Sequence, residues 1–318
     1  MSSILSSFPK NNLLTPTEIE RIRIMMTNNP SRRCFLKTIG LAAALPFVPR
    51  PLLAEPDGAT LHRIMTCNIL FDLPEQKGTP EDWSAGRRDV CLKAIKARRP
   101  DIFCLQEVGL GQRDDFATAF PEFTGFGYVD PYTDTNPRRF QSIKNMIFYS
   151  SARYEQISSG QYWLSETPLI AGSRLAGEGL PRHVTWVRLK DRASKKQFRI
   201  LNTHWGLKQP TRAIEAKILS TEAGSPYHPD FRQLLCGDFN SVLRSIEHNT
   251  LADAGWKDTY ETIHGPVKNE PSSPFLKHKI DYIYFHGKVT PAAAEIFREQ
   301  QGGIYPSDHP FVSADVTL

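Results

Sequence analysis

The sequence predicts an α/β protein in which two mainly antiparallel sheets pack face to face with helices outside. Short apolar runs follow one another from Leu61 to the C-terminus, and only two clearly helical stretches separate them. A doubly wound parallel sheet has about one helix for each strand, so the excess of strands favours paired antiparallel sheets. With 318 residues and no internal repeat, the chain is long enough for one large domain.

The first half of this domain contains four predicted strands and one helix. Residues 61–70, LHRIMTCNIL, read as a buried strand. Residues 84–100 place apolar side chains at helical spacing and end in Pro100, so they read as a helix. The other strands are expected at residues 101–107, 144–150 and 155–165.

The second half contains five predicted strands and a second helix, at residues 211–220. The strands are expected at residues 183–190, 196–204, 232–240, 279–285 and 310–318. Two long stretches rich in Gly, Pro and Ser, residues 171–181 and 264–279, read as loops.

The positive charge of the chain is concentrated at its N-terminus. Residues 1–54 hold seven Lys and Arg against Glu18 and Glu20, which accounts for the whole formal charge of +5. The remaining residues, 55–318, carry 32 basic and 32 acidic side chains. Because duplex DNA binding depends strongly on Lys and Arg at phosphates, this balance disfavours duplex DNA as the substrate.

The basic N-terminus has the pattern of a twin-arginine export signal. Ser31, Arg32 and Arg33 precede Phe35-Leu36-Lys37, and an apolar stretch over residues 38–48 follows. That stretch is too short to span a bilayer as a helix. We therefore expect residues 1–54 to be a signal and leader with cleavage near Ala54. The twin-arginine machinery would be a partner, and the domain of residues 55–318 would be periplasmic or secreted.

The cysteines do not suggest a metal site. Cys34 lies in the leader, and the other four, Cys67, Cys91, Cys104 and Cys236, have no metal-ligand spacing. Cys67, Cys104 and Cys236 fall within predicted strands and Cys91 within the predicted helix. We expect them to be buried free thiols, since cysteine packs as a small hydrophobic residue.

Polar side chains stand at the ends of six of the predicted strands. If the strands lie side by side, these ends meet at one edge of the sandwich, where bare carboxylates would repel each other. A hard cation relieves the repulsion, and oxygen ligands suit Mg²⁺ or Mn²⁺. The residues concerned are Asn68, Glu107, Asn202, His204, Asp238, Asn240, Asp281, Asp308 and His309.

Six short motifs around these residues resemble the endonuclease/exonuclease/phosphatase superfamily, which has the deoxyribonuclease I-like fold. They are TCNIL, LQEV, NTHWG, GDFNS, KIDYIYF and SDHPFV, and they occur in the order typical of that superfamily. GQYWLSETP and GLPRHVTWVRL further resemble an exported bacterial branch. The resemblance runs from about Arg63 to the C-terminus and implies a four-layered α/β sandwich.

The resemblance also implies roles at a metal and phosphate site. Glu107 resembles the principal Mg²⁺ ligand, Asn68 assists at both the metal and the phosphate, and Asp308 is a candidate additional metal ligand. Arg182 resembles a basic residue near the substrate. A surface Arg paired with a neighbouring acid would explain Arg182 equally well.

The remaining roles concern proton transfer. His309 resembles the catalytic histidine beside the scissile phosphate, and Asp281 resembles its orienting carboxylate. Asp238 and Asn240 resemble the pair that orients or deprotonates the attacking water, and His204 matches a second histidine at a phosphate oxygen or the leaving group. Either Asp238 or His309 is the base; the sequence leaves both open.

Together these features predict an exported, Mg²⁺-dependent phosphoesterase that hydrolyses a phosphodiester or phosphomonoester by in-line attack of water. Its substrate class is open among a nucleic acid, a phospholipid or sphingomyelin head group, and a sugar or inositol phosphate. A binding module that kept the fold and lost the chemistry is the alternative, although every metal and histidine position is filled. A zinc hydrolase is disfavoured because no H-E-x-x-H spacing occurs.

Overall fold

The computed structural model describes most of the chain after residue 59 and shows where the predicted site residues lie. The predicted leader, residues 1–54, and most of the loop 264–279, including Lys277, lie outside the described part. The described residues are 60–73, 76–79, 82–127, 143–224, 227–266, 278–297 and 299–318.

Six strands form the first sheet, sheet A, in the order β11-β12-β1-β2-β4-β3. Only β1 and β2 pair in parallel, and the other four pairings are antiparallel. The strands are β1 (His62–Asn68), β2 (Ile102–Val108), β3 (Phe123–Phe126), β4 (Lys144–Ser150), β11 (Thr290–Phe297) and β12 (Phe311–Thr317).

The second sheet, sheet B, repeats this plan with the order β5-β6-β7-β8-β10-β9. Again one central pair, β7 and β8, is parallel and the remaining pairings are antiparallel. Its strands are β5 (Tyr154–Trp163), β6 (His183–Asp191), β7 (Gln197–His204), β8 (Gln233–Asp238), β9 (Lys257–Asp258) and β10 (Asp281–His286).

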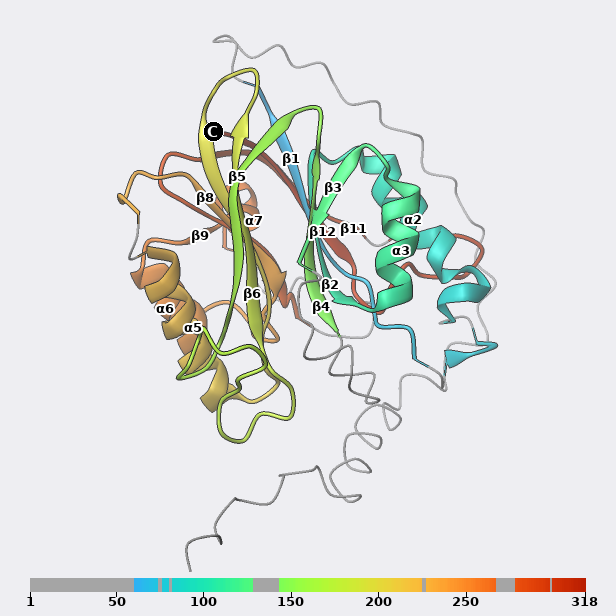
Figure 1. The fold of residues 1–318 in the computed structure, drawn as a ribbon, viewed down its shortest axis with the longest axis horizontal. Coiled ribbons are helices and arrows are strands. Elements are labelled where there is room, and N and C mark those ends of the chain that lie inside the picture. The colour runs from blue at the N-terminus through green and yellow to red at the C-terminus, as the bar shows by residue number, and fades with distance from the viewer. Residues whose placement is uncertain are drawn as a thin grey trace, which may run out of the picture. The chain divides into compact units, whose positions relative to one another are not determined.

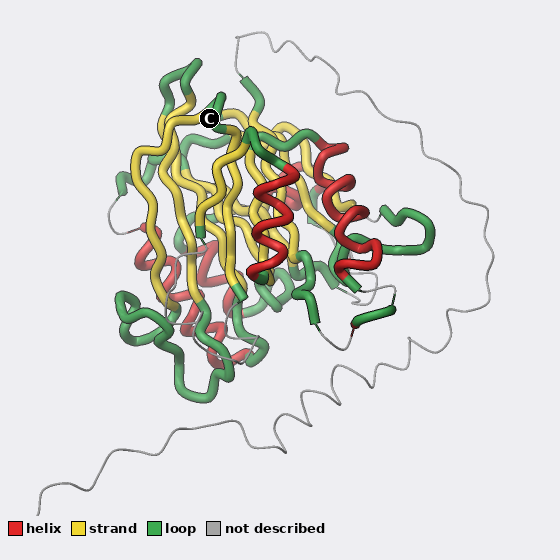
Figure 2. Tube along the Cα trace, turned by 45° about the vertical axis from the view of Figure 1, so that its right-hand side comes forward, coloured by secondary structure: helices red, strands yellow, loops and turns green. Residues whose placement is uncertain are grey.

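The sheets and helices form four layers (Figure 1). One apolar cluster lies between the two sheets. A second lies between sheet A and its helices, and a third lies between sheet B and its helices. Figure 2 shows the strands running side by side with the helices outside them. The helices are η3 (Trp83–Arg87), α2 (Arg88–Arg98) and α3 (Leu110–Ala119) on sheet A, with α5 (Gln209–Gly224), α6 (Ile246–Asp253) and α7 (Thr259–His264) later in the chain.

This architecture confirms the predicted fold class, and the sequence missed several smaller elements. The unpredicted strands are edge strands with weak signals: β3 has a half-exposed FTGF sequence, β9 has two residues, and β11 reads TPAAAEIF. Edge strands bury little surface, so alternation of apolar and polar residues is weak there. The short helices α3, α6 and α7 were missed for the same reason, because each buries only a few side chains.

A buried polar contact joins the two sheets close to the functional edge. Gln106 Nε2 on β2 donates to Asn202 Oδ1 on β7 at 2.6 Å, and Asn202 Nδ2 donates to the carbonyl oxygens of Leu105 and Met146. Asn202 therefore fixes the sheets against each other and does not face a substrate.

The four cysteines of the described part are free and buried, as predicted. No helix within the described ranges is long and apolar enough to cross a membrane.

Candidate active site

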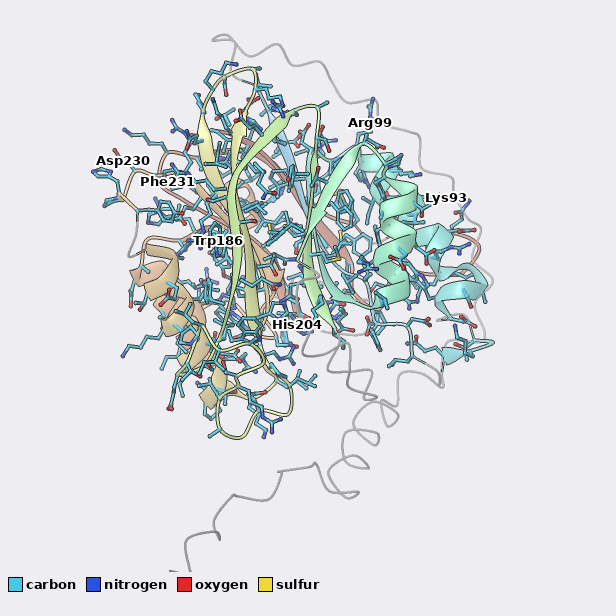
Figure 3. All side chains as sticks on the ribbon, viewed as in Figure 1. Lys93, Arg99, Trp186, His204, Asp230 and Phe231 are labelled. Carbon is cyan, nitrogen blue, oxygen red and sulfur yellow. The ribbon has the colours of Figure 1, made fainter. Side chains whose placement is uncertain are left out.

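Three of the predicted catalytic side chains form one row across the end of sheet B. His204 at the end of β7 is the register partner of Asp238 at the end of β8, and Asp238 is in turn the partner of Asp281 at the start of β10. All three are at least nine-tenths buried. Figure 3 shows His204 at the lower end of the sheet, well separated from Asp230 and Phe231 near the opposite edge.

The sequence GDFN shapes this row. A Cβ atom at Gly237 would lie 2.3 Å from the Thr203 carbonyl oxygen, so only glycine allows β8 to approach β7 this closely. After Asp238 the chain turns sharply, and Asn240 adopts a left-handed conformation with φ 47°. Its backbone N–H donates to Asp238 Oδ1 at 2.8 Å and its Nδ2 donates to the Trp205 carbonyl oxygen at 2.9 Å.

His309 completes the row from the other sheet, since it lies two residues before β12. Its Nδ1 is 2.8 Å from Asp281 Oδ2, a hydrogen bond, and its Nε2 is 3.7 Å from Asp238 Oδ2. The His204 Nε2 atom is 3.5 Å from the same Asp238 oxygen. The His309 backbone N–H donates to Ser307 Oγ, which tightens the turn that presents the imidazole. The structure thus brings together the four residues predicted to handle protons and phosphate charge.

The protonation of this cluster follows from burial and mutual charge. Burial, reinforced by the neighbouring Asp281 carboxylate, raises the pKa of Asp238 to about 7. Burial alone lowers the pKa of His309, but the Asp281 and Asp238 carboxylates outweigh it and hold that pKa well above its usual value. Burial, with the positive charges of Arg182 and His309, lowers the pKa of His204 well below its usual value. At neutral pH the cluster therefore holds a cationic His309, a neutral His204 and an Asp238 poised to exchange a proton.

Asn68 and Glu107 form the sheet A half of the site. Asn68 Nδ2 donates to Glu107 Oε1 at 3.1 Å and to Asp238 Oδ2 at 3.0 Å, so it links the two halves. The turn after β1 holds both residues: the Leu70 N–H donates to Asn68 Oδ1 and the Phe71 N–H donates to Glu107 Oε2. Leu70 and Glu107 have positive φ angles of 55° and 62°. Such backbone conformations are costly for residues other than glycine and cluster at functional sites.

Arg87, the last residue of η3, supports that turn. It is 1% exposed and donates to the carbonyl oxygens of Ile69 and Leu70. Gln112 on α3 donates to the same Leu70 carbonyl at 3.0 Å. Gly86 at φ 147° makes the kink that turns Arg87 inward. Only this kink could have signalled the role, because helical spacing places Arg87 beside the half-buried Arg88.

The two remaining predicted residues flank the cluster. Asp308 is half-buried beside His309, where Ser307 Oγ donates to its Oδ1, and its charge reaches Arg87 together with that of Glu107. Arg182 precedes β6 and is half-buried, and its Nε atom is buried without a hydrogen-bond partner among the described atoms.

The residues present fit a hard divalent cation. The donor set is rich in oxygen, with the Glu107 carboxylate, the Asn68 amide and the Asp238 carboxylate connected by hydrogen bonds. The buried Asp281 Oδ1 atom has no hydrogen-bond partner among the described atoms. Ligand atoms of Asp238, Asp281 and His309 also lie within 4.8 Å of one another. Because His309 Nδ1 and Asp281 are already joined by a hydrogen bond, we interpret that trio as a proton-handling group.

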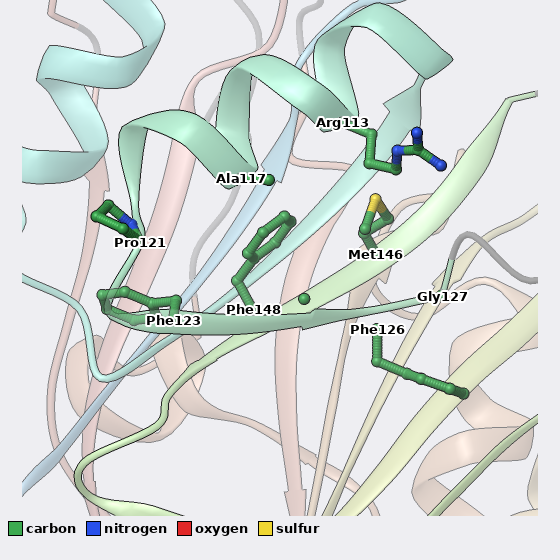
Figure 4. Close-up of a pocket in the computed structure, with 9 residues that line it drawn as sticks. Arg113, Ala117, Pro121, Phe123, Phe126, Gly127, Met146 and Phe148 are labelled. Carbon is green, nitrogen blue, oxygen red and sulfur yellow. The ribbon is translucent and has the colours of Figure 1, made fainter.

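A separate groove lies away from these side chains, between α3 and strands β3 and β4 (Figure 4). Its volume is about 340 Å³. Its lining is mainly aromatic or small, including Phe123, Phe148 and Met146, with Arg113 as the one charged lining residue. It shares no residue with the cluster described above.

The sequence profile of the Endonuclease/Exonuclease/phosphatase family matches residues 65–309. The chain belongs to this family. The match begins in β1 and ends at His309, so it contains every predicted site residue. Members of the family are phosphoesterases that act as nucleases or phosphatases, which agrees with a site that combines carboxylates, histidines and a candidate cation position.

Several solved structures and curated proteins are similar to this chain. An endonuclease/exonuclease/phosphatase structure from Bacteroides vulgatus superposes with a TM-score of 0.71 at 27% identity, covering 81% of this chain and 99% of that one. A mannosyl-6-phosphatase from Bacteroides thetaiotaomicron has a TM-score of 0.67 at 22% identity, covering 81% of this chain and all of that one. Mouse nocturnin is 23% identical over 265 residues, a match that spans 73% of this chain and 58% of nocturnin.

Proposed function

We propose that this protein is a Mg²⁺-dependent phosphoesterase that hydrolyses a phosphodiester or phosphomonoester by in-line attack of water. The observation that carries the proposal is the buried row of His204, Asp238, Asp281 and His309, with Asn68 joining it to Glu107. A structural ion pair would not need three residues with strained backbone next to it, nor two histidines facing one carboxylate oxygen.

In this mechanism Asp238 acts as the base. A carboxyl group with a pKa near 7 takes the proton of the attacking water efficiently at neutral pH. The new bond forms between the water oxygen and phosphorus as the bond to the leaving alcohol breaks. Asn240 and Asn68 hold the Asp238 carboxylate in place through its Oδ1 and Oδ2 atoms.

The histidines stabilise the negative charge that builds on the phosphoryl oxygens. His309 is a cation held by Asp281, so its Nε2 proton is available to an oxygen of the substrate. His204 stays neutral and can donate a hydrogen bond to a phosphate oxygen or the leaving group. Arg182, with its buried Nε free of other partners among the described atoms, adds a positive charge beside His204.

Glu107, with Asn68 and Asp308, would hold Mg²⁺ or its substitute Mn²⁺, which when bound would supply Lewis-acid polarisation of a phosphoryl oxygen. The neighbour named as a mannosyl-6-phosphatase supports phosphate ester chemistry and makes a sugar phosphate one candidate substrate.

The experiment is a substrate panel assayed with Mg²⁺, Mn²⁺ or EDTA. The panel contains bis-nitrophenyl phosphate, single- and double-stranded DNA, RNA, sphingomyelin, and sugar and inositol phosphates. His309→Ala is the test variant and His228→Ala, an exposed histidine outside the cluster, is the matched control. Metal-dependent hydrolysis that His309→Ala abolishes and His228→Ala retains would support the proposal. A folded protein that binds Mg²⁺ and cleaves nothing would instead favour an inert binding module.

We also propose export through the twin-arginine machinery, supported by the Ser31-Arg32-Arg33 pattern and the following apolar stretch. A reporter fused to residues 1–60 should reach the periplasm. Changing Arg32 and Arg33 to Lys should retain it in the cytoplasm, and unchanged export of the double variant would refute the proposal.

A further inference from the structure

Large apolar side chains are exposed mainly at the end of the molecule that holds the candidate active site. Among the described residues nine such side chains are exposed; four of them lie on three loops of sheet B at this end, and a fifth, Ile246, is the first residue of α6. We call these five the apolar rim: Leu169, Ile170, Leu207, Val242 and Ile246. Leu169 is 89% exposed and Leu207 is 68% exposed. Contiguous exposed apolar patches on a soluble protein usually mark an interaction surface.

The loops that carry the rim contact one another. Lys208 Nζ, next to Leu207, donates to the Gly177 carbonyl oxygen on the loop that follows β5. Thr211 Oγ1 donates to Glu178 on the same loop. The loop that carries Leu169 and Ile170 and the loop that carries Leu207 are therefore neighbours.

A second connection joins the loop after β7 to α6. Arg212 Nη1 donates to the Leu207 carbonyl at 2.6 Å, and Arg212 Nε donates to Glu247 Oε1 at 2.8 Å, directly beside Ile246. These contacts keep Leu207 and Ile246 on the same side of the molecule.

The rim also adjoins the catalytic cluster. Leu207 follows His204 by three residues and Val242 follows Asn240 by two. The hydrogen bond from Asn240 Nδ2 to the Trp205 carbonyl at 2.9 Å holds these two turns together. Leu207 and Val242 therefore lie on the two turns that directly follow His204 and Asn240.

The turns at the opposite end of the strands show that the exposed apolar side chains are specific to the end that holds the site. The turns 151–153, 192–196 and 287–289 carry Arg and Lys side chains and none of the nine exposed large apolar ones. A general tolerance for exposed apolar residues would have placed some of them there as well.

The charge around the rim favours an anionic, apolar partner. The three segments 164–182, 205–212 and 239–247 carry five Lys and Arg against three Glu. Two of the three glutamates, Glu178 and Glu247, already accept hydrogen bonds from Thr211 and Arg212. Arg174, Lys208 and Arg244 are exposed on these segments, and of the three Arg244 is paired with Glu261.

We propose that the apolar rim docks on the surface of a phospholipid bilayer and presents the site to a phosphate ester in a lipid head group. The aliphatic side chains would enter the acyl boundary while the basic side chains meet the lipid phosphates. The rim consists only of Leu, Ile and Val, whereas energetic centres of protein–protein interfaces are enriched in Trp, Tyr and Arg. The lipid substrate class rests on the phosphoesterase function proposed above, but the docking surface does not.

The test is co-sedimentation of the full chain with vesicles of phosphatidylcholine, with and without phosphatidylglycerol. The test variant is Leu169→Ser/Ile170→Ser, and the matched control is Ile157→Ser/Ile263→Ser, two exposed residues outside the rim. The parent and the control should bind, more tightly with phosphatidylglycerol, and the rim variant should bind about tenfold more weakly. Unchanged thermal unfolding midpoints would show that all variants remain folded. Because every variant carries the same leader, differences between them report on the rim.

Two results would overturn the proposal: no binding of the parent to either vesicle, or equal binding of the parent and the rim variant. Hydrolysis of any soluble phosphodiester or phosphomonoester of the substrate panel by the parent separates this inference from the function it rests on. Vesicle binding without hydrolysis would support the docking surface and contradict the phosphoesterase function. Hydrolysis without vesicle binding would support the phosphoesterase function and contradict the docking surface.

Discussion

The two sheets have the same topology at the site but contribute different chemistry. In each sheet a central parallel pair, β1 with β2 and β7 with β8, ends in polar residues at the same edge. Sheet A supplies the Asn68 amide and the Glu107 carboxylate, and the turn after β1 holds both. Sheet B supplies His204, Asp238 and Asp281, and burial beside the Asp281 carboxylate raises the pKa of Asp238 to about 7.

This difference shows that the strand ends, rather than the backbone plan, determine what each half does. The sheet A half fits a cation, and the sheet B half fits proton transfer. Asn68 joins them by donating to both Glu107 and Asp238. Variants in the two halves should therefore fail in different ways.

The largest effect is expected from Asp281→Asn in the sheet B half. The neutral amide no longer stabilises a cationic His309 through the 2.8 Å contact, so turnover should fall by about 10³-fold. Affinity for Mn²⁺ and the unfolding midpoint should stay near the parental values. Steady-state kinetics and metal titration measure both. The exposed Asp253→Asn is the matched control, and full activity of Asp281→Asn would refute the assigned pairing.

Glu107→Gln in the sheet A half should act through the metal. We expect the Mg²⁺ concentration for half-maximal activity to rise by about 10- to 100-fold, with activity partly restored at high Mg²⁺. The measurement is activity as a function of Mg²⁺, with the exposed Glu122→Gln as control. An unchanged Mg²⁺ dependence would remove Glu107 from the cation site.

Arg87 tests the sheet A half indirectly, because it supports the turn that holds Glu107. Arg87→Met leaves the Ile69 and Leu70 carbonyl oxygens without this donor, so we expect a loss of about 2–4 kcal/mol in the free energy of unfolding. The turn that holds Glu107 should loosen, and Mn²⁺ affinity should fall about tenfold. Arg87→Lys should recover part of both. Loss of stability with unchanged metal affinity would limit Arg87 to a structural role.

The smallest effect concerns acid stability. Burial lowers the pKa of His183 and of His248, both on the sheet B side, to about 3. Each takes up a proton in the unfolded chain near its ordinary pKa of 6.5, well before it does so in the folded protein. The contribution of these neutral, buried histidines to the free energy of unfolding is therefore complete above pH 6.5 and is lost as the pH falls toward 3.

Between pH 7 and pH 5 the free energy of unfolding should fall by about 2 kcal/mol for each of these histidines. Urea unfolding at several pH values would measure this loss, and His183→Gln should make the decline shallower. An identical decline in parent and variant would contradict the assignment of His183.

Much of the site could be predicted because polar residues interrupt apolar runs at strand ends. Asp238 and Asp281 were recognised in this way, and the register of β8 with β10 places them together. The position of His309 depends on the pairing of β1 with β12, which joins the two ends of the domain. The sequence indicated this only through the resemblance, because local patterns do not encode contacts at such separation.

The rest could not be predicted because its signal is tertiary. Arg87 looks like a surface residue until the Gly86 kink and the turn after β1 are seen together. Asn202 resembles a site residue by its place near a strand end, yet it bonds across to Gln106 in the other sheet. Edge strands such as β11 pair on one side only, so their sequences carry little alternation.

The most direct test of the division between the two halves is to measure Mn²⁺ affinity by calorimetry in Asp281→Asn and Glu107→Gln, alongside turnover. The account predicts that Asp281→Asn keeps parental Mn²⁺ affinity while losing turnover, and that Glu107→Gln loses affinity. If Asp281→Asn loses Mn²⁺ affinity as strongly as Glu107→Gln, then the trio of Asp238, Asp281 and His309 binds the metal itself, and the proposed division is wrong.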